Sequence, residues 1–332
     1  MSNDVVPSPS GSFLDEINLP KLVAGPAGEA IARLIGGAVD IPAAWLAQVA
    51  QGVKDKTAAK TAVSKAVADA AANLAKNDPE IVQRAAHSLL SKELRHQTNK
   101  EAVAKKALEE LGDEPLSKTE KPDDDWFNVF ERYAEDASSE QFQDIWGRIL
   151  AGQLRKPKAF SLQTLRFVSE LDEHIASLFE KWSARVIDGD YIADPPKQGD
   201  EFTELLQLED FGLVSGASAQ LTKTLTIKED PPSPQLRRLS FEFKDHTLIA
   251  LMHDPVSITI QNVLLTRVGR EIYTITKAKG TLQPIKEFAN SLPKHNAESI
   301  VCFPKNAIGG GLPSVLWTKP TQDQDGQAGT GN

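Results

Sequence analysis

Six histidines and one cysteine are the residues best able to bind a metal ion or act as nucleophiles, and their spacing matches no such site. No two histidines form a His-x-His or His-Glu-x-x-His pair, so local spacing predicts no zinc site, although ligands distant in the sequence stay open. Cys302 has no second cysteine with which to form a disulfide, which fits a reducing compartment. The histidines are His87, His96, His174, His246, His253 and His295.

Carboxylates next to histidines or to each other offer the next candidates. The pairs Asp245–His246 and His253–Asp254 border β-rich runs, where sequence neighbours point to opposite faces of a strand, so we interpret them as strand ends and turns. The three aspartates 123–125 could bind a hard cation. A carboxylate run before an apolar periodic stretch is more typical of a helix N-terminus, so we expect a cap there.

The sequence also contains no motif of a phosphate loop or of a serine nucleophile. The glycines 309–311 lack the following Lys-Ser/Thr of a phosphate loop, and no Gly-x-Ser-x-Gly motif occurs. The sequence therefore assigns no catalytic, cofactor-binding or metal-binding residue, and it favours a non-enzymatic function. A cryptic activity stays open, because unrelated sites recur on common folds.

The clearest helical periodicity lies in residues 123–171 and predicts three short amphipathic helices. The first follows the aspartate cap, the second follows a capping-box pattern of Ser138 and Gln141, and the third follows Ser161. Large apolar side chains recur at three- and four-residue steps, so we expect them to form a compact core. The predicted core residues are Trp126, Phe130, Trp146, Ile149, Phe160 and Leu165.

Within this run, the segment from Trp146 to Leu165 resembles the signature of a bacterial family called domain of unknown function 2806. Gln153 and Lys158 depart from the family's usual Glu and Gly, and the resemblance covers roughly residues 80–280. It implies no catalytic residues, because the family has no assigned activity. Similar segments occur in abortive-infection alpha-type proteins, so the resemblance suggests phage defence. The matching residues are Trp146, Gly147, Ile149, Leu150, Ala151, Gly152, Pro157, Phe160, Ser161, Leu162, Thr164 and Leu165.

The N-terminal region predicts helices but no membrane span. Residues 1–20 lack a basic region followed by an apolar run, so they predict a disordered leader rather than a signal peptide. The longest uncharged stretch in residues 21–53 is the 13 residues Ile41–Val53, shorter than the roughly 20 that a spanning helix needs. A helical hairpin is favoured there, with peripheral membrane contact left open. Lys54–Lys76 has a helix-forming composition, and Pro79 begins a further helix.

Charge argues against a generally basic, nucleic-acid-binding protein. The net charge is −9, and residues 113–144 alone hold eleven acidic against three basic residues, which indicates a solvated linker and helix face. A nucleic-acid-binding regulator remains the alternative hypothesis, and it would use a basic helix at 84–106 together with a winged-helix-like domain at 195–320. Its candidate contacts are Arg84, Lys92, Arg95, Lys105, Lys106, Arg237 and Arg238.

The sequence pattern changes from mainly helical to β-rich after residue 195. A short acidic helix ended by Gly212 precedes several β-rich runs, which resembles a winged-helix architecture. DNA-binding winged helices concentrate positive charge on the recognition helix, and this one is acidic, so docking or structural use is favoured. The predicted fold class is α+β, with mainly helical N-terminal and central regions before a smaller winged-helix-like domain.

The predicted division is a leader (1–20), an Ala-rich helical region (21–112), a tryptophan core (113–190), a winged-helix-like domain (195–320) and a disordered tail (321–332). We expect a non-enzymatic interaction or oligomerisation protein of the bacterial cytoplasm, with phage defence as its setting. The expected partner is a second copy or another protein. No cofactor is expected.

Overall fold

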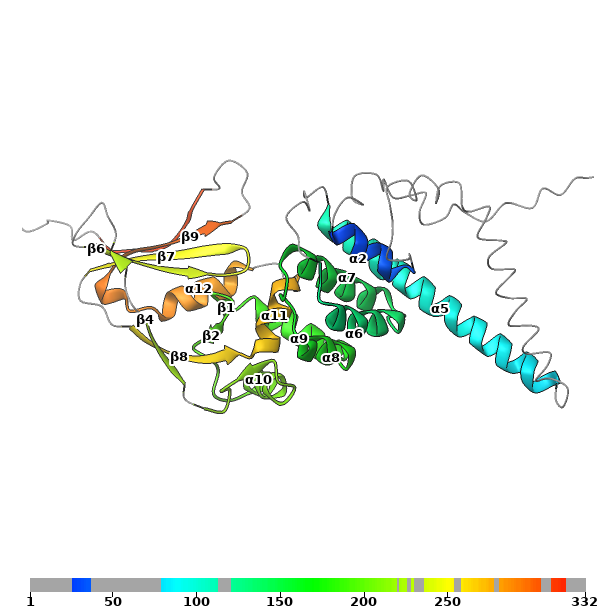
Figure 1. The fold of residues 1–332 in the computed structure, drawn as a ribbon. Helices are drawn as coiled ribbons and strands as arrows, with labels where there is room; N and C mark the ends of the chain where they lie inside the picture. The colour runs from blue at the N-terminus through cyan, green and yellow to red at the C-terminus, as the bar shows by residue number, and fades with distance from the viewer. Residues whose placement is uncertain are drawn as a thin grey trace, which may run out of the picture. The chain divides into compact units, whose positions relative to one another are not determined.

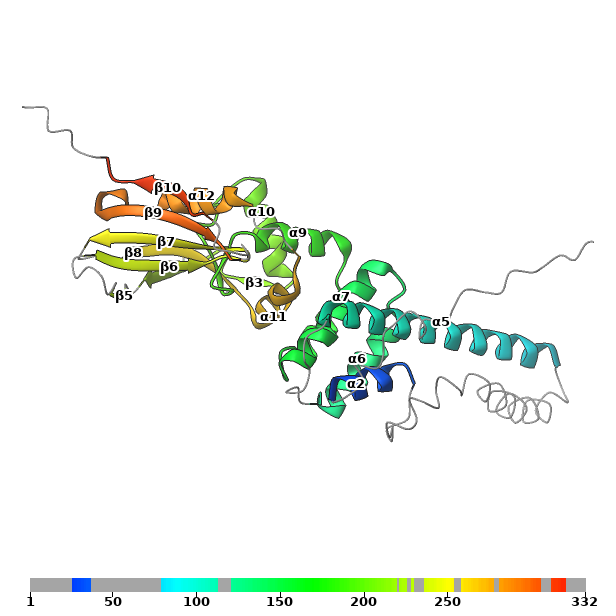
Figure 2. The ribbon, with the colours of Figure 1, turned by 90° about the horizontal axis from the view of Figure 1, so that it is seen from above.

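A computed structural model describes residues 26–36, 79–112, 121–219, 221–225, 228–229, 236–253, 258–277, 281–305 and 312–320. The chain forms two compact units, Met1–Leu165 and Arg166–Asn332 (Figures 1 and 2). The border between the units falls inside the stretch that the sequence predicts as one tryptophan core. Several predictions lie outside the described residues, namely those for 1–20, Ile41–Val53, Lys54–Lys76, the glycines 309–311 and the tail 321–332.

In its described residues the first unit is helical, and the longest of these helices lies beside three others (Figure 1). Proline is well suited to the first position of a helix, which is where Pro79 stands. The helices are α2 (Pro26–Leu34), α5 (Pro79–Leu111), α6 (Asp124–Glu135) and α7 (Glu140–Arg155), and α8 (Leu162–Ser169) crosses the border between the units.

Polar side chains directly before α6 and α7 cap the N-termini of these helices. The Asp123 carboxylate accepts hydrogen bonds from the backbone N–H groups of Asp125 (3.0 Å) and Trp126 (3.2 Å), which confirms the predicted cap. At α7 the cap is Ser139, whose hydroxyl accepts a hydrogen bond from the Phe142 N–H at 3.3 Å. The prediction of Ser138 was therefore wrong by one residue, because α7 begins at Glu140 and the hydroxyl directly before it reaches the free N–H group.

Aromatic rings form the centre of the first unit. Trp126 stacks on Phe130 with ring centroids 5.2 Å apart, and Trp146 and Phe130 form a T-shaped pair with ring centroids 5.7 Å apart. The indole N–H of Trp126 donates a 2.8 Å hydrogen bond to the carbonyl of Phe160, so its polar atom is satisfied inside the core. All six predicted core residues are buried.

The second unit contains two antiparallel sheets. In the first sheet, β1 (Val186–Ile187), β2 (Tyr191–Ala193) and β8 (Ile258–Leu265) are consecutive, and β3 (Val214–Ser215) and β4 (Thr222–Leu225) both pair with the other side of β8. The order of the second sheet is β10 (Ser314–Thr318), β9 (Ala297–Pro304), β7 (His246–His253), β6 (Leu236–Glu242) and β5 (Lys228–Glu229). The helices are α9 (Glu173–Ser183), α10 (Asp200–Asp210), α11 (Arg267–Ile275) and α12 (Leu282–Ser291).

Alternating side chains of the second sheet face a core shared with α12. Leu248, Ala250 and Met252 on β7 are fully buried, as a period of two predicts for a strand with one covered face. Phe288 of α12 meets Phe241 of β6 edge to face at 4.8 Å, and Figure 1 shows α12 lying along one face of this sheet. The α+β fold class is confirmed, whereas the winged-helix likeness stays a prediction.

Replacing Trp146 with alanine should lower the free energy of unfolding by about 3–5 kcal/mol, because the ring is only 2 % exposed and its removal leaves a cavity. Urea unfolding followed by circular dichroism measures this loss. Leu162→Ala is the control, since that side chain is 49 % exposed and its loss should change stability by less than about 0.5 kcal/mol. Equal midpoints for the two variants would show that Trp146 is not a core residue.

Candidate interaction surface on helix α5

Helix α5 has a covered half and an exposed half. From His96 onward its inward side chains are buried, including Val103, Ala104 and Ala107 at 0 % exposure. No described side chain of α5 before His96 is fully buried. Figure 2 shows one end of α5 extending past α2, α6 and α7. Its large apolar side chains there are exposed, namely Ile81 (55 %), Leu89 (54 %), Leu90 (61 %) and Leu94 (64 %).

The exposed apolar residues continue the buried face of the same helix. Eighteen residues make about five full helical turns, so positions that far apart point in the same direction. Ala85 and Leu89 stand five turns before the buried residues Val103 and Ala107, and Ile81 stands five turns before Asn99. We call the exposed part of this face the α5 stripe. It consists of Ile81, Ala85 and Leu89, with Val82, Ala86 and Leu90 at its margin. The stripe has the composition of a core-facing helix surface without a described element over it.

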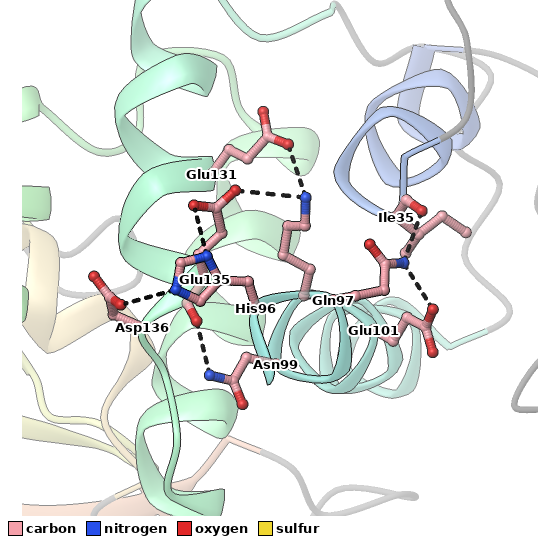
Figure 3. A network of polar contacts seen from close by, with 9 residues as sticks. Ile35, His96, Gln97, Asn99, Glu101, Glu131, Glu135 and Asp136 are labelled. Carbon is pink, nitrogen blue, oxygen red and sulfur yellow. Dashed lines mark hydrogen bonds and ion pairs between the residues drawn. The ribbon is translucent and has the colours of Figure 1, made fainter. Parts of the chain in front are cut away.

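Polar contacts lock α5 to α6 at the point where the stripe leaves the core (Figure 3). The His96 ring is 11 % exposed and lies between two carboxylates, with Nδ1 3.6 Å from Glu135 and Nε2 3.7 Å from Asp136. Asn99 donates a 2.7 Å hydrogen bond to the carbonyl of Glu135 at the end of α6. Lys100 lies 3.3 Å from Glu131 and 3.5 Å from Glu135.

A second polar contact fixes the end of α2 on the other side of α5. The Gln97 side chain donates hydrogen bonds to the carbonyl of Ile35 (3.0 Å) and to Glu101 (2.7 Å). Figure 3 shows Gln97 reaching α2 while His96 reaches α6. The covered half of α5 is therefore clamped from two sides, and this clamp defines where the exposed half begins.

His174, His253 and Cys302 take part in packing or in cross-element hydrogen bonds. His174 meets Gln207 at 3.3 Å, joining α9 to α10, and His253 meets Glu298 at 2.9 Å, joining β7 to β9. Cys302 is buried in the core of the second unit, and burial raises the pKa of its thiol, which disfavours the reactive thiolate. Among the residues that the structure describes, no three His, Cys, Asp or Glu side chains gather as a metal ion would require.

The basic residues named for nucleic-acid contact divide between the two units. Arg84, Lys92 and Arg95 lie on the exposed half of α5, where Arg84 pairs with Glu80 at 3.4 Å. Lys106 lies in the covered half, and its hydrogen bond to Glu140 raises its pKa. Lys105 is also in the covered half.

The two candidate arginines of the second unit are neighbours on β6 and therefore point to opposite faces of the sheet. Arg237 lies opposite the buried Met252, and Arg238 lies opposite Leu251. These two side chains do not form one patch. The seven residues are thus not one continuous basic surface within either unit, and nucleic-acid binding stays a prediction.

The exposed half of α5 could not have been identified from periodicity alone. The sequence shows an irregular apolar stripe along residues 81–111, and the same pattern describes a fully covered helix. Only the positions of α6 and α7 show that the cover ends at His96.

Residues 83–188 match the model of a family described as "Protein of unknown function (DUF2806)". The match starts within α5 and ends just after β1, so it includes the contacts between α5 and α6 and most of the predicted tryptophan core. It supports the resemblance seen in the Trp146–Leu165 motif. No curated protein and no solved structure matches the chain. Within the described ranges, no helix has the length and apolar character needed to cross a bilayer.

Replacing Glu135 with alanine should lower the free energy of unfolding by about 1–3 kcal/mol, because His96 and Lys100 both lose a partner in a partly buried site. Chemical denaturation monitored by tryptophan fluorescence is the suitable measurement. Glu170→Ala is the matched control, since its pair with Arg166 is exposed and worth little. The two variants would unfold at the same midpoint if the clamp contributed nothing.

Proposed function

We propose that this chain is a non-enzymatic interaction protein and that the α5 stripe is its contact surface. The observation that carries the proposal is the continuation of a buried helix face into solvent, with Ile81, Leu89 and Leu90 each more than half exposed. Contiguous apolar surface of this kind on a soluble protein is typical of an interaction site.

The energetics favour occupation of the stripe by a protein. Fully burying one leucine or isoleucine side chain contributes about 1.5–3 kcal/mol, so a few such residues can offset much of the entropy lost on association. An amphipathic helix that presents residues at three- and four-residue steps is a common recognition element. The clamp at His96 supports this use, because it holds the base of the exposed half rigidly.

The cell-level setting that we propose is phage defence in the bacterial cytoplasm. It rests only on the resemblance of the Trp146–Leu165 segment to abortive-infection alpha-type proteins, because the matched family has no assigned function. Equal plaque counts on strains with and without the gene would contradict this setting while leaving the contact surface intact.

The mass of the full-length chain in solution tests the contact surface. By light scattering after size exclusion, we expect complexes heavier than the 36.1 kDa chain, and the double variant Leu89→Glu/Leu90→Glu should elute at the chain mass. The added charges cannot be buried without a large desolvation penalty.

The matched control places the same two charges on the far side of α5. His87→Glu/Ser91→Glu should leave the complexes unchanged, because both positions point away from the stripe. A wild-type chain that elutes alone at 36.1 kDa, like the double variant, would contradict the proposal. A complex that absorbs as nucleic acid and dissociates at high salt would favour the alternative regulator, with Arg84, Lys92 and Arg95 as its contacts.

A further inference from the structure

We propose that the occupant of the α5 stripe is a second copy of this chain, whose own exposed half of α5 packs against the first in the antiparallel direction. The inference rests on the proposed function and names the partner of the same surface. It predicts a two-fold symmetric dimer built on residues 79–95 of both copies.

The uncovered part of α5 has a defined length. Residues 79–95 correspond to about 25 Å of helix, bounded by the start of α5 at Pro79 and by the clamp at His96. Beyond His96 the same face of α5 is already occupied by α6 and α7. A second helix on the stripe must therefore stop, or turn away, at the level of His96.

Only the antiparallel direction satisfies this limit without bending α5. A parallel second helix would carry its own covered half alongside the first at the level of α6 and α7, where the face is taken. An antiparallel second helix begins with its Pro79 near the first copy's His96, and its covered half lies past the first copy's Pro79. The exposed halves then overlap along their full length, and antiparallel helix dipoles also attract.

The residues at matching levels fit this arrangement. With the two-fold axis midway between Pro79 and His96, which is between His87 and Ser88, Leu89 of each copy lies level with Ala86 of the other. A small residue opposite a large one lets two helices approach closely. This axis therefore places Leu89, the leucine at the centre of the stripe, opposite an alanine.

Glu93 supports the same direction. It stands five turns before the buried residue Leu111, so it is one of two charged positions, with Lys92, on the face of the stripe. A parallel pair in register would set Glu93 against Glu93 inside the contact, and like charges at close range repel. The antiparallel pair sets it level with Val82 instead.

Cysteine cross-linking of the full-length chain distinguishes the arrangements. Val82→Cys and Glu93→Cys are made as separate variants and treated with a short bismaleimide, alone and as an equal mixture. The antiparallel dimer predicts a cross-linked species at twice 36.1 kDa in the mixture and its loss in either variant alone. The wild-type chain is the background control, because its single cysteine, Cys302, is buried.

Each outcome decides between occupants. Strong cross-linking of each variant with itself would establish a parallel pair and overturn the proposal. A chain of 36.1 kDa with no cross-link in any sample would also overturn it and would leave residues 37–78 of the same chain as the occupant. Heavier complexes that depend on Leu89 and Leu90 but give no cross-link would overturn the dimer alone, since the stripe would then bind a different protein. Circular dichroism of each variant checks that α5 remains folded.

Discussion

The close approach of α5 to α7 is the contact on which the arrangement of the first unit depends. A Cβ atom at Gly147 would lie 2.5 Å from the Cβ of Lys106 and 2.9 Å from the backbone nitrogen of Ala107, so only glycine allows this separation. The short distance lets Val103 and Ala107 bury completely and brings Lys106 within 3.2 Å of Glu140. At the far end, Arg155 of α7 donates to the carbonyl of Glu110, which satisfies a free acceptor of the last turn of α5.

This anchoring explains how the exposed half can be helical at all. An isolated helix is marginal in water up to about 15 residues because nucleation is unfavourable, and the exposed half, residues 79–95, is only slightly longer. In α5 the covered half supplies the nucleus, and the exposed half extends it by one hydrogen bond per residue. The clamp around His96 marks the border between the covered half and the exposed half, since the burial of apolar side chains ends there. A partner on the stripe would therefore add stability mainly to residues 79–95.

The second unit shows the opposite balance between local and distant contacts. Its strands β6, β7 and β8 carry alternating apolar residues, and their existence could be predicted from that period. Strands β1, β2 and β3 have only two or three residues, too few for any period to show. Helix α12 was also missed, because its apolar residues Ile285, Phe288 and Ala289 follow a Pro-containing start and gain their role from Phe241 across the core.

The sequence by itself determined the helices of the first unit, the long β6–β8 strands, the core residues such as Trp146, and the lack of a recognisable catalytic motif. These features depend on local propensity, caps and periodicity, which are properties of neighbouring residues. The candidate surface was different. Ala85 and Leu89 have the same spacing and apolar chemistry as Val103 and Ala107 five turns later, yet one pair is exposed and the other buried. That difference is decided by where α6 and α7 end along α5, and the length of a tertiary cover is not encoded in the periodicity of the helix it covers.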